Sequence, residues 1–217
     1  VQGFEKTDLP DSFFDAAIGN VPFGDFKVMD KRYDKLNFLV HDYFFAKVID
    51  KIRPGGVVAF ITSNGISGGT FDKRDNRVRK YLAQRCDLIG AIRLPNTTFA
   101  DSAGADITTD ILFLQKLDRQ RTVDPDQLEW IDVDIIHEND HVNAKGENRH
   151  RMVTLNKYYQ THPEMVLGKL EVISGPFGPQ LVCKPDPDTD IETLLTNAIQ
   201  NLHAEITEYV MDDPEAE

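Results

Sequence analysis

The sequence predicts an α/β fold in which strands and helices alternate as far as residue 116, followed by a smaller α/β extension. An apolar run at residues 13–18, ended by Gly19 and Asn20, indicates a buried strand that enters a loop. Apolar residues at three- and four-residue steps indicate an amphipathic helix at 38–52. The β-favouring run 57–62 then follows a Pro-Gly-Gly turn, as expected for a strand covered on both faces. Together these segments form one α/β unit.

The later elements follow from the same patterns. They are a basic helix at 75–86, a strand at 88–94 closed by Pro95, and a strand at 109–116. Residues 13–116 therefore alternate in the manner of a doubly wound sheet. After residue 117 we expect a strand at 129–136, a polar surface excursion at 137–152, a short strand at 181–183, and a helix at 191–210 capped by Asp188 or Asp190. We divide the chain at this point, into 1–117 and 118–217.

Composition limits the partners. The 217 residues carry 24 Lys and Arg against 36 Asp and Glu, a formal charge of −12, so the average surface repels nucleic acid and anionic membrane. Any DNA contact must therefore be local. Cys86 and Cys183 have no metal-ligand spacing, which argues against structural zinc and suits a reducing, cytoplasmic compartment. No apolar run approaches the roughly 20 residues that span a bilayer. The start at Val1-Gln2-Gly3 suggests an excised piece.

The most specific feature is Asn20-Val21-Pro22-Phe23, placed where the first strand ends. It resembles the Asn-Pro-Pro-Phe/Tyr motif of adenine-N6 DNA methyltransferases. Three further blocks, at 53–63, 90–99 and 108–116, are similar to segments that follow this motif in the family. The resemblance covers residues 3–117 and implies a partial Rossmann-like methyltransferase sheet from the catalytic-loop strand onward. More weakly, 156–159 and 162–168 resemble the region after the methylase block in large bacterial methylase–helicase fusions.

The chemistry of adenine methylation explains these residue types. The adenine amino nitrogen shares its lone pair with the ring, so an enzyme must draw that pair back onto nitrogen and aim it at a sulfonium methyl. The Asn20 side-chain oxygen and the Val21 carbonyl supply two acceptors for the two N–H bonds. Pro22 fixes the turn, and Phe23 offers a face to an extruded base. Val21 replaces the family's first proline, which keeps the carbonyl but loosens the turn.

The methyl donor that the resemblance implies is S-adenosylmethionine. In the family it is held by a Gly-rich turn after the first strand and an acidic residue after the second, both upstream of the catalytic loop. Gly3 is the only glycine in residues 1–12, which leaves no room for a Gly-rich turn. We therefore expect no cofactor-binding residues in this chain and no activity from it alone. Gly65, Gly68 and Gly69 match no phosphate-binding template and indicate a mobile loop.

Local basic charge marks candidate DNA contacts. The segment from Asp72 to Lys80 carries Lys73, Arg74, Arg77, Arg79 and Lys80. The loop after the motif carries Lys27, Lys31, Arg32 and Lys35, for which phosphate contact and an ordinary solvated surface are equally favoured.

The histidines indicate no catalytic or metal centre. His41 and Asp42 are adjacent on a helix, where neighbours do not face each other, so we expect a cap or packing role. His137, His141 and His150 fit no metal template, so we expect no metal site.

In the family's strand order the strand 13–18 lies next to the first strand. Without that strand it becomes a sheet edge, which we expect to be covered by a second copy of the chain or by the C-terminal extension. The expected partners are therefore DNA, the rest of the parent polypeptide with the N-terminal half of the methylase and a helicase, and a homodimer mate, but no membrane. Two other functions stay open. One is an inert DNA-engaging or scaffolding module of a methylase–helicase fusion. The other is a nucleotide-binding oxidoreductase-type domain, which the missing Gly-x-Gly-x-x-Gly turn disfavours.

Overall fold

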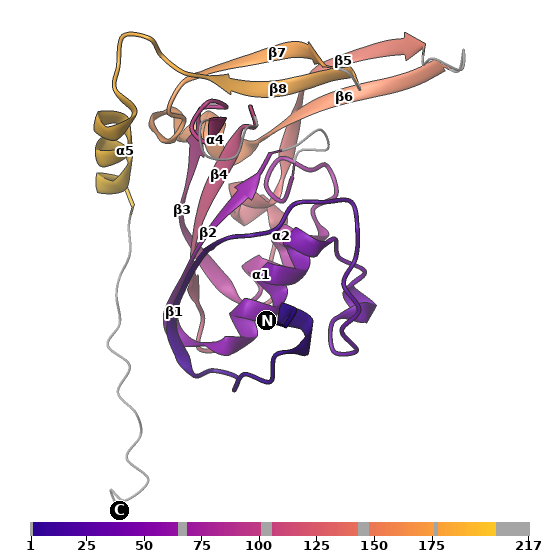
Figure 1. The fold of residues 1–217 in the computed structure, drawn as a ribbon, viewed down its shortest axis with the longest axis vertical. Coiled ribbons are helices and arrows are strands. Elements are labelled where there is room, and N and C mark those ends of the chain that lie inside the picture. Colours follow the sequence, from indigo (N-terminus) through magenta and orange to yellow (C-terminus); the bar gives the residue numbers. More distant parts are fainter. Residues whose placement is uncertain (1, 65–68, 101–105, 143–147, 176–177, 203–217) are drawn as a thin grey trace, which may run out of the picture.

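The computed structural model describes residues 2–64, 69–100, 106–142, 148–175 and 178–202 (Figure 1). Its largest sheet contains β1 (Phe14–Asn20), β2 (Ile52–Ser63), β3 (Cys86–Leu94) and β4 (Thr109–Lys116), in the order β1-β2-β4-β3. β1 and β2 are parallel, whereas β4 runs antiparallel to both β2 and β3. The α/β fold class is confirmed. The antiparallel position of β4 between β2 and β3 is a finding of the tertiary structure.

Two helices connect the strands. The helix α1 (Val40–Lys51) joins β1 to β2, and α2 (Arg77–Ala83) precedes β3. Asp42 in the first turn of α1 and Lys51 in its last turn complement the helix dipole. Both helices lie on the same side of the sheet (Figure 1). Buried Phe45 and Ile49 of α1 belong to one apolar cluster with Val58 and Phe60 of β2. Burial of these side chains fixes the helices on that face.

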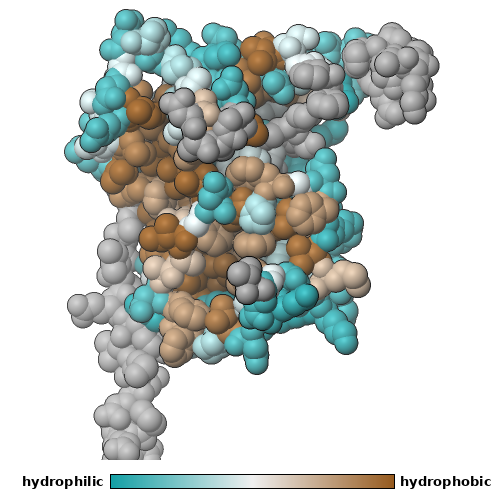
Figure 2. Space-filling view, in the orientation of Figure 1, coloured by the Kyte–Doolittle hydropathy of each residue, from teal (hydrophilic) through white to brown (hydrophobic). Residues whose placement is uncertain are grey.

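The opposite face of the sheet is more open. Val57, Ala59 and Ile61 of β2 are only half-buried, and Ile18 of β1 keeps 85% of its surface exposed. Apolar side chains gather over this part of the molecule (Figure 2). The predictions of a buried strand at 13–18 and of a strand at 57–62 covered on both faces are therefore wrong. The reason is that α1 and α2 share one face and that, among the described residues, β1 has a neighbouring strand on only one side.

β1 is a sheet edge, as the strand order of the resembled family implies. In the described part of the chain it pairs with β2 alone, and no strand of the extension pairs with it. The expectation that the extension covers this edge is thus not met by the described residues. Cover by a second copy stays a prediction.

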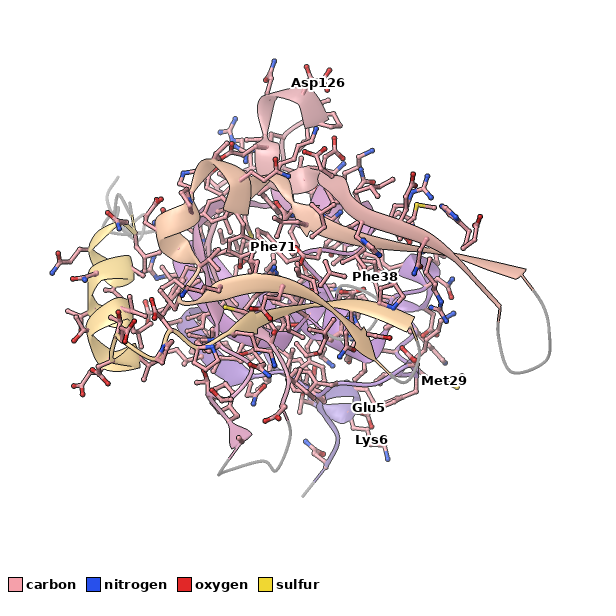
Figure 3. The ribbon with its side chains drawn as sticks, turned by 90° about the horizontal axis from the view of Figure 1, so that it is seen from above. Glu5, Lys6, Met29, Phe38, Phe71 and Asp126 are labelled. Carbon is pink, nitrogen blue, oxygen red and sulfur yellow. The ribbon has the colours of Figure 1, made fainter. Side chains whose placement is uncertain are left out.

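The extension consists of two antiparallel hairpins and two helices. Its elements are β5 (Val133–Val142), β6 (Asn148–Asn156), α4 (Lys157–Thr161), β7 (Lys169–Gly175), β8 (Gly178–Lys184) and α5 (Ile191–Gln200). The hairpins lie across one end of the molecule, with α5 to one side (Figure 3). The expected polar excursion at 137–152 is instead mostly the hairpin β5–β6. The expected strand at 129–136 overlaps β5 over 133–136 only, because 129–131 form a 3₁₀ turn. The rest of β5 shows no apolar alternation, since residues 137–140 are polar and exposed.

Two further expectations concern the end of the chain. Asp190, not Asp188, caps α5, because its side chain accepts a hydrogen bond from the backbone N–H of Thr193. Residues 203–210 of the expected helix, and the acidic tail, lie outside the described residues.

The buried interior crosses the expected boundary between residues 117 and 118. One apolar cluster contains Ile92 and Leu112 of the sheet together with Ile131 and Tyr159 of the extension. The division into 1–117 and 118–217 stays a prediction. No helix in the described residues is long and apolar enough to cross a membrane.

An ion-pair cluster beside the start of β1 gives the fold a pH dependence. The carboxylate of Asp11 accepts hydrogen bonds from Lys51 Nζ and Arg32 Nη1, each at 2.6 Å. The hydrogen bond from Lys51, with that from Arg32, holds the pKa of Asp11 below its ordinary value. Because the pKa is lower in the folded state, this carboxylate stabilises the fold above pH about 4. That stabilisation is lost as the pH falls through the folded-state pKa.

We therefore expect Asp11→Asn to lower the free energy of unfolding more at pH 7 than at pH 3. Urea unfolding of both proteins at the two pH values measures this. An equal loss at both would show that the ion pair does not stabilise the fold.

Candidate functional site

The four motif residues lie at the carboxyl end of β1. Val21 is buried, and its backbone N–H donates to the carbonyl of Ile61 at 3.0 Å, which extends the pairing with β2 by one residue. Asn20 and Pro22 are exposed, and Phe23 keeps 41% of its surface exposed. The motif is thus anchored by Val21, while the side chains on either side of it face solvent at the rim of the sheet.

Two adjoining cavities lie beside the motif. The first, of about 160 Å³, is lined by Gly24, Asp25, Leu39, His41, Ser63, Gly69 and Lys73. The second, of about 190 Å³, is lined by Lys27, Asn37, Phe38, Leu39, Asp42, Lys73, Asp75, Arg77 and Val78. Leu39 and Lys73 border both. We call these two cavities the rim cavities. They are bounded by the segments that follow β1 and β2 and by the start of α1, which is where an open α/β sheet binds ligands.

A polar chain runs beneath the rim cavities. Thr70 Oγ1 donates to Asp42 Oδ1 at 3.0 Å and lies 3.3 Å from Thr62 Oγ1. His41 Nε2 is 3.5 Å from the same Asp42 oxygen. Burial raises the pKa of Asp42, an effect that His41 and Lys73 oppose. Burial also lowers the pKa of His41, so its ring is neutral near pH 7.

His41 and Asp42 were expected to serve only in capping or packing, but the two side chains approach each other. Both stand in the first turn of α1, where His41 lines the first rim cavity and Asp42 the second, and their side chains come within 3.5 Å of each other between the two. Asp25, Ser63 and Gly69 also line the first cavity. Gly69 has a φ of +52°, and a Cβ there would collide with the carbonyl of Ser63, so glycine is required. Gly65 and Gly68 lie outside the described residues.

The five basic residues predicted to meet DNA separate into two groups. Lys73 and Arg77 line the rim cavities, Arg74 is exposed with Nη1 3.6 Å from Met152 Sδ, and Lys80 is half-buried. Arg79 does not belong with them. It is fully buried, and its guanidinium donates to the carbonyls of Ile131, Thr70 and Lys73.

The prediction that Arg79 contacts DNA is therefore wrong. Its place on α2 turns it toward the interior, where burial lowers its pKa to about 10 and three carbonyls satisfy it. In the second basic loop, Arg32 is engaged by Asp11 and Asp50.

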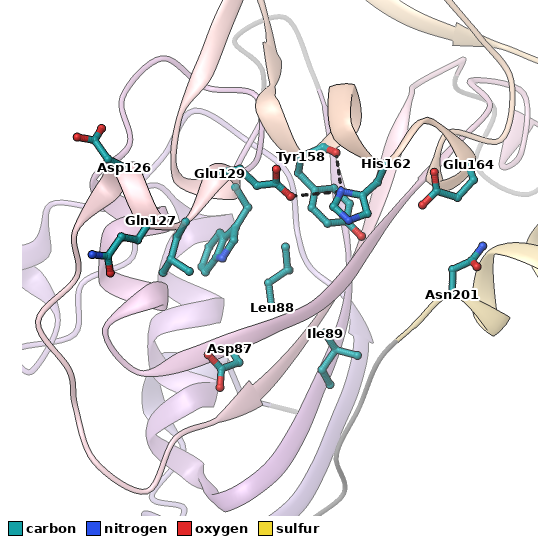
Figure 4. Close-up of a pocket in the computed structure, with 12 residues that line it drawn as sticks. Asp87, Leu88, Ile89, Asp126, Gln127, Glu129, Tyr158, His162, Glu164 and Asn201 are labelled. Atoms are coloured by element: carbon teal, nitrogen blue, oxygen red, sulfur yellow. Dashed lines mark hydrogen bonds and ion pairs between the residues drawn. The ribbon is translucent and has the colours of Figure 1, made fainter.

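A larger hollow of about 580 Å³ lies at the opposite end of the sheet, beside the start of β3 (Figure 4). Its wall carries four acids, Asp87, Asp126, Glu129 and Glu164, so it repels a polyanion. His162 stacks on Tyr158 there and lies 3.3 Å from Glu129. By volume this hollow would be the preferred binding site, but its negative wall disfavours DNA.

The extension histidines do not form a metal centre among the described residues, where no group of three His, Cys, Asp or Glu side chains could hold an ion. His150 Nδ1 instead lies 3.0 Å from Asp140 across the β5–β6 ladder. This hydrogen bond raises the pKa of the exposed His150.

Together these features define an α/β domain with a polar site at the carboxyl ends of its parallel strands. Residues 3–165 match the family model of N-6 DNA Methylase, and the chain belongs to this family. The match extends past residue 117, into β6 and α4.

Known relatives are much longer than this chain. It is 34% identical over 121 residues to the Defense against restriction protein B of Escherichia phage P1, a match that covers 54% of this chain and 5% of that protein. A putative class I S-adenosylmethionine-dependent methyltransferase of Listeria monocytogenes is 21% identical, covering 54% of this chain and 36% of the other, with a TM-score of 0.39. The M protein of the type I restriction enzyme EcoKI is 14% identical, covering 88% and 48%, with a TM-score of 0.37. Likenesses this distant support no assignment beyond the family.

Proposed function

We propose that the chain carries the target-facing half of a DNA adenine-N6 methyltransferase that uses S-adenosylmethionine. The single observation that supports this best is the exposed Asn20 at the end of β1, next to the anchored Val21 and within a family of N-6 DNA methylases. Loss of methylation on substitution of Asn20 is the decisive test.

In this proposal each motif residue has its own task. The Asn20 amide oxygen and the Val21 carbonyl accept hydrogen bonds from the two N–H groups of the adenine amine, which draws the nitrogen lone pair out of conjugation with the ring and back onto nitrogen. The hydrogen bond from Val21 N to Ile61 O keeps the loop from moving as the amine binds. Phe23 stacks on the extruded base through its exposed face.

The methyl donor, when bound, supplies the electrophilic methyl group. The described residues before β1 contain one 3₁₀ turn, Phe4–Lys6, and no strand, so they do not fit a Gly-rich strand–turn for the donor. We assign no residue of this chain to the donor and no step to it. We propose instead that the donor-binding half belongs to another part of the parent polypeptide and that the chain alone is inactive.

The free edge of β1 supports a partner strand. Its outer backbone groups have no strand partner among the described residues, and Ile18 is exposed beside them. A strand of the N-terminal methylase half is the partner we favour, with a second copy of the chain as the alternative. A helicase in the same polypeptide is a further proposal, which the much greater length of the phage relative permits, since the match covers 54% of this chain but only 5% of that protein.

DNA contact by the basic residues at the rim cavities predicts a salt effect. In the full-length protein, Lys73→Gln and Arg77→Gln should each flatten the slope of log binding constant against log salt by about one, because each removes one phosphate contact. Fluorescence anisotropy with a labelled duplex at several salt concentrations measures the slope. Lys6→Gln, at an exposed site in the Phe4–Lys6 turn, is the matched control and should leave it unchanged. Equal slopes for the wild type and all three variants would mean that Lys73 and Arg77 do not contact DNA.

A further inference from the structure

The segment between β2 and α2 is held by a residue of the extension. Asn156, at the end of β6, is completely buried. Its side-chain Nδ2 donates to the carbonyl of Phe71 at 2.8 Å and to that of Trp130 at 2.9 Å. Its backbone N–H donates to Asp72 Oδ1 at 2.8 Å. Nearby, Thr154 Oγ1 donates to the carbonyl of Asp72 at 2.6 Å. The extension therefore holds two consecutive residues of this segment, Phe71 and Asp72, by hydrogen bonds.

The gripped residues are continuous with the wall of the rim cavities. Gly69 and Lys73, which line the first cavity, stand on either side of the segment Thr70–Phe71–Asp72. Asp72 Oδ2 accepts a hydrogen bond at 3.0 Å from the side chain of Asn64, which directly follows the cavity residue Ser63. A shift of Asp72 would move both walls at once.

All hydrogen-bonding groups of the Asn156 side chain have partners. Asn156 Oδ1 accepts from the backbone N–H of Tyr158 at 3.0 Å, so both side-chain hydrogens and the oxygen are engaged. Buried amides with complete partners have one orientation, because any rotation would leave polar atoms unpaired in an apolar interior. Asn156 therefore holds the segment in one position, which a solvated surface contact would not do.

We propose that Asn156 is a positioning residue, through which the extension sets the place of Lys73 and the shape of the first rim cavity. The proposal gives residues 118–202 a role in the reaction without a contact to substrate. It rests on the proposed function for its effect on DNA, but its effect on the segment 69–73 stands on geometry alone.

The first test is hydrogen exchange followed by mass spectrometry on the full-length protein. Asn156→Ala should speed exchange in peptides that cover 69–73 while leaving β3 peptides unchanged. Leu155→Ala is the matched control, since Leu155 is a buried neighbour on β6 that makes no hydrogen bond to 69–73 among the described residues. It should lower the melting temperature without selective exchange at 69–73. Equal exchange in this segment for Asn156→Ala and the control would overturn the proposal.

The second test is a double-mutant cycle on DNA binding. In the wild-type background Asn156→Ala should flatten the salt slope by about one, as loss of the Lys73 contact does. In the Lys73→Gln background it should cause no further change. A further drop of similar size there would show that Asn156 does not act through Lys73, and would overturn that part of the proposal. If Asn20→Ala leaves methylation intact, the proposed function fails, yet the exchange experiment still decides whether Asn156 positions 69–73.

Discussion

Asn20→Ala in the full-length protein should lower kcat for adenine methylation by at least about 100-fold while DNA affinity stays within about twofold. The reason is that Asn20 offers its oxygen to the amine as charge develops on nitrogen, and loss of one such preorganised group costs about 10²–10³ in kcat. The side chain is exposed at the rim, so its removal leaves no hole in the core. Radiolabelled methyl transfer into a defined duplex gives kcat, and anisotropy gives the affinity.

Asn20→Asp is the matched variant, because it keeps the acceptor and the size but adds charge. We expect it to retain more activity than Asn20→Ala. Methylation unchanged in both variants would favour the inert DNA-engaging module over the enzyme. A loss of DNA binding equal to the loss of kcat would instead place Asn20 in recognition and not in chemistry.

Arg93→Met should destabilise the protein by about 3–5 kcal/mol, because it leaves buried carboxylates without their cation. Arg93 on β3 is fully buried and pairs with Asp110 at 2.8 Å and Asp72 at 2.8 Å. Tyr159 of the extension donates to Asp110 at 2.9 Å. Burial alone would lower the pKa of Arg93, but the two carboxylates raise it well above its ordinary value. For a chain of this size the expected fall in melting temperature is roughly 6–20 °C.

Thermal and urea unfolding measure this effect, and the pH supplies a second check. Burial already raises the pKa of Asp72, an effect that Arg93 opposes, so without Arg93 this pKa rises further. A raised folded-state pKa means stability lost as the pH increases. Arg93→Met should therefore be more damaging at pH 8 than at pH 5. Arg119→Met removes an exposed partner of Asp118 and should change stability by less than about 0.5 kcal/mol. A similar small effect for Arg93→Met would mean that the buried network does not hold the extension to the sheet.

Local sequence patterns predicted much of the fold. The strand at 109–116 was predicted with its observed bounds, and α1 was placed within two residues, because apolar periodicity and the Pro-Gly-Gly turn are local signals. Of the hairpin β5–β6 only residues 133–136 fall within an expected strand, since the polar, exposed residues 137–140 lack the alternation on which strand prediction depends. The same limit explains Arg79: a basic side chain in a basic stretch gives no sign that it points inward.

The α/β order of elements, the motif Asn20-Val21-Pro22-Phe23 and its place after a strand follow from local sequence, because strand ends and turns depend on short stretches of residues. Three features emerge only in the folded chain: β4 lies between β2 and β3, His41 approaches Asp42, and Asn156 holds the segment beside Lys73. Those contacts join residues that are distant in the chain or that diverge in an ideal helix. They depend on how apolar faces pack, and packing is a property of the whole chain and not of any short stretch of it.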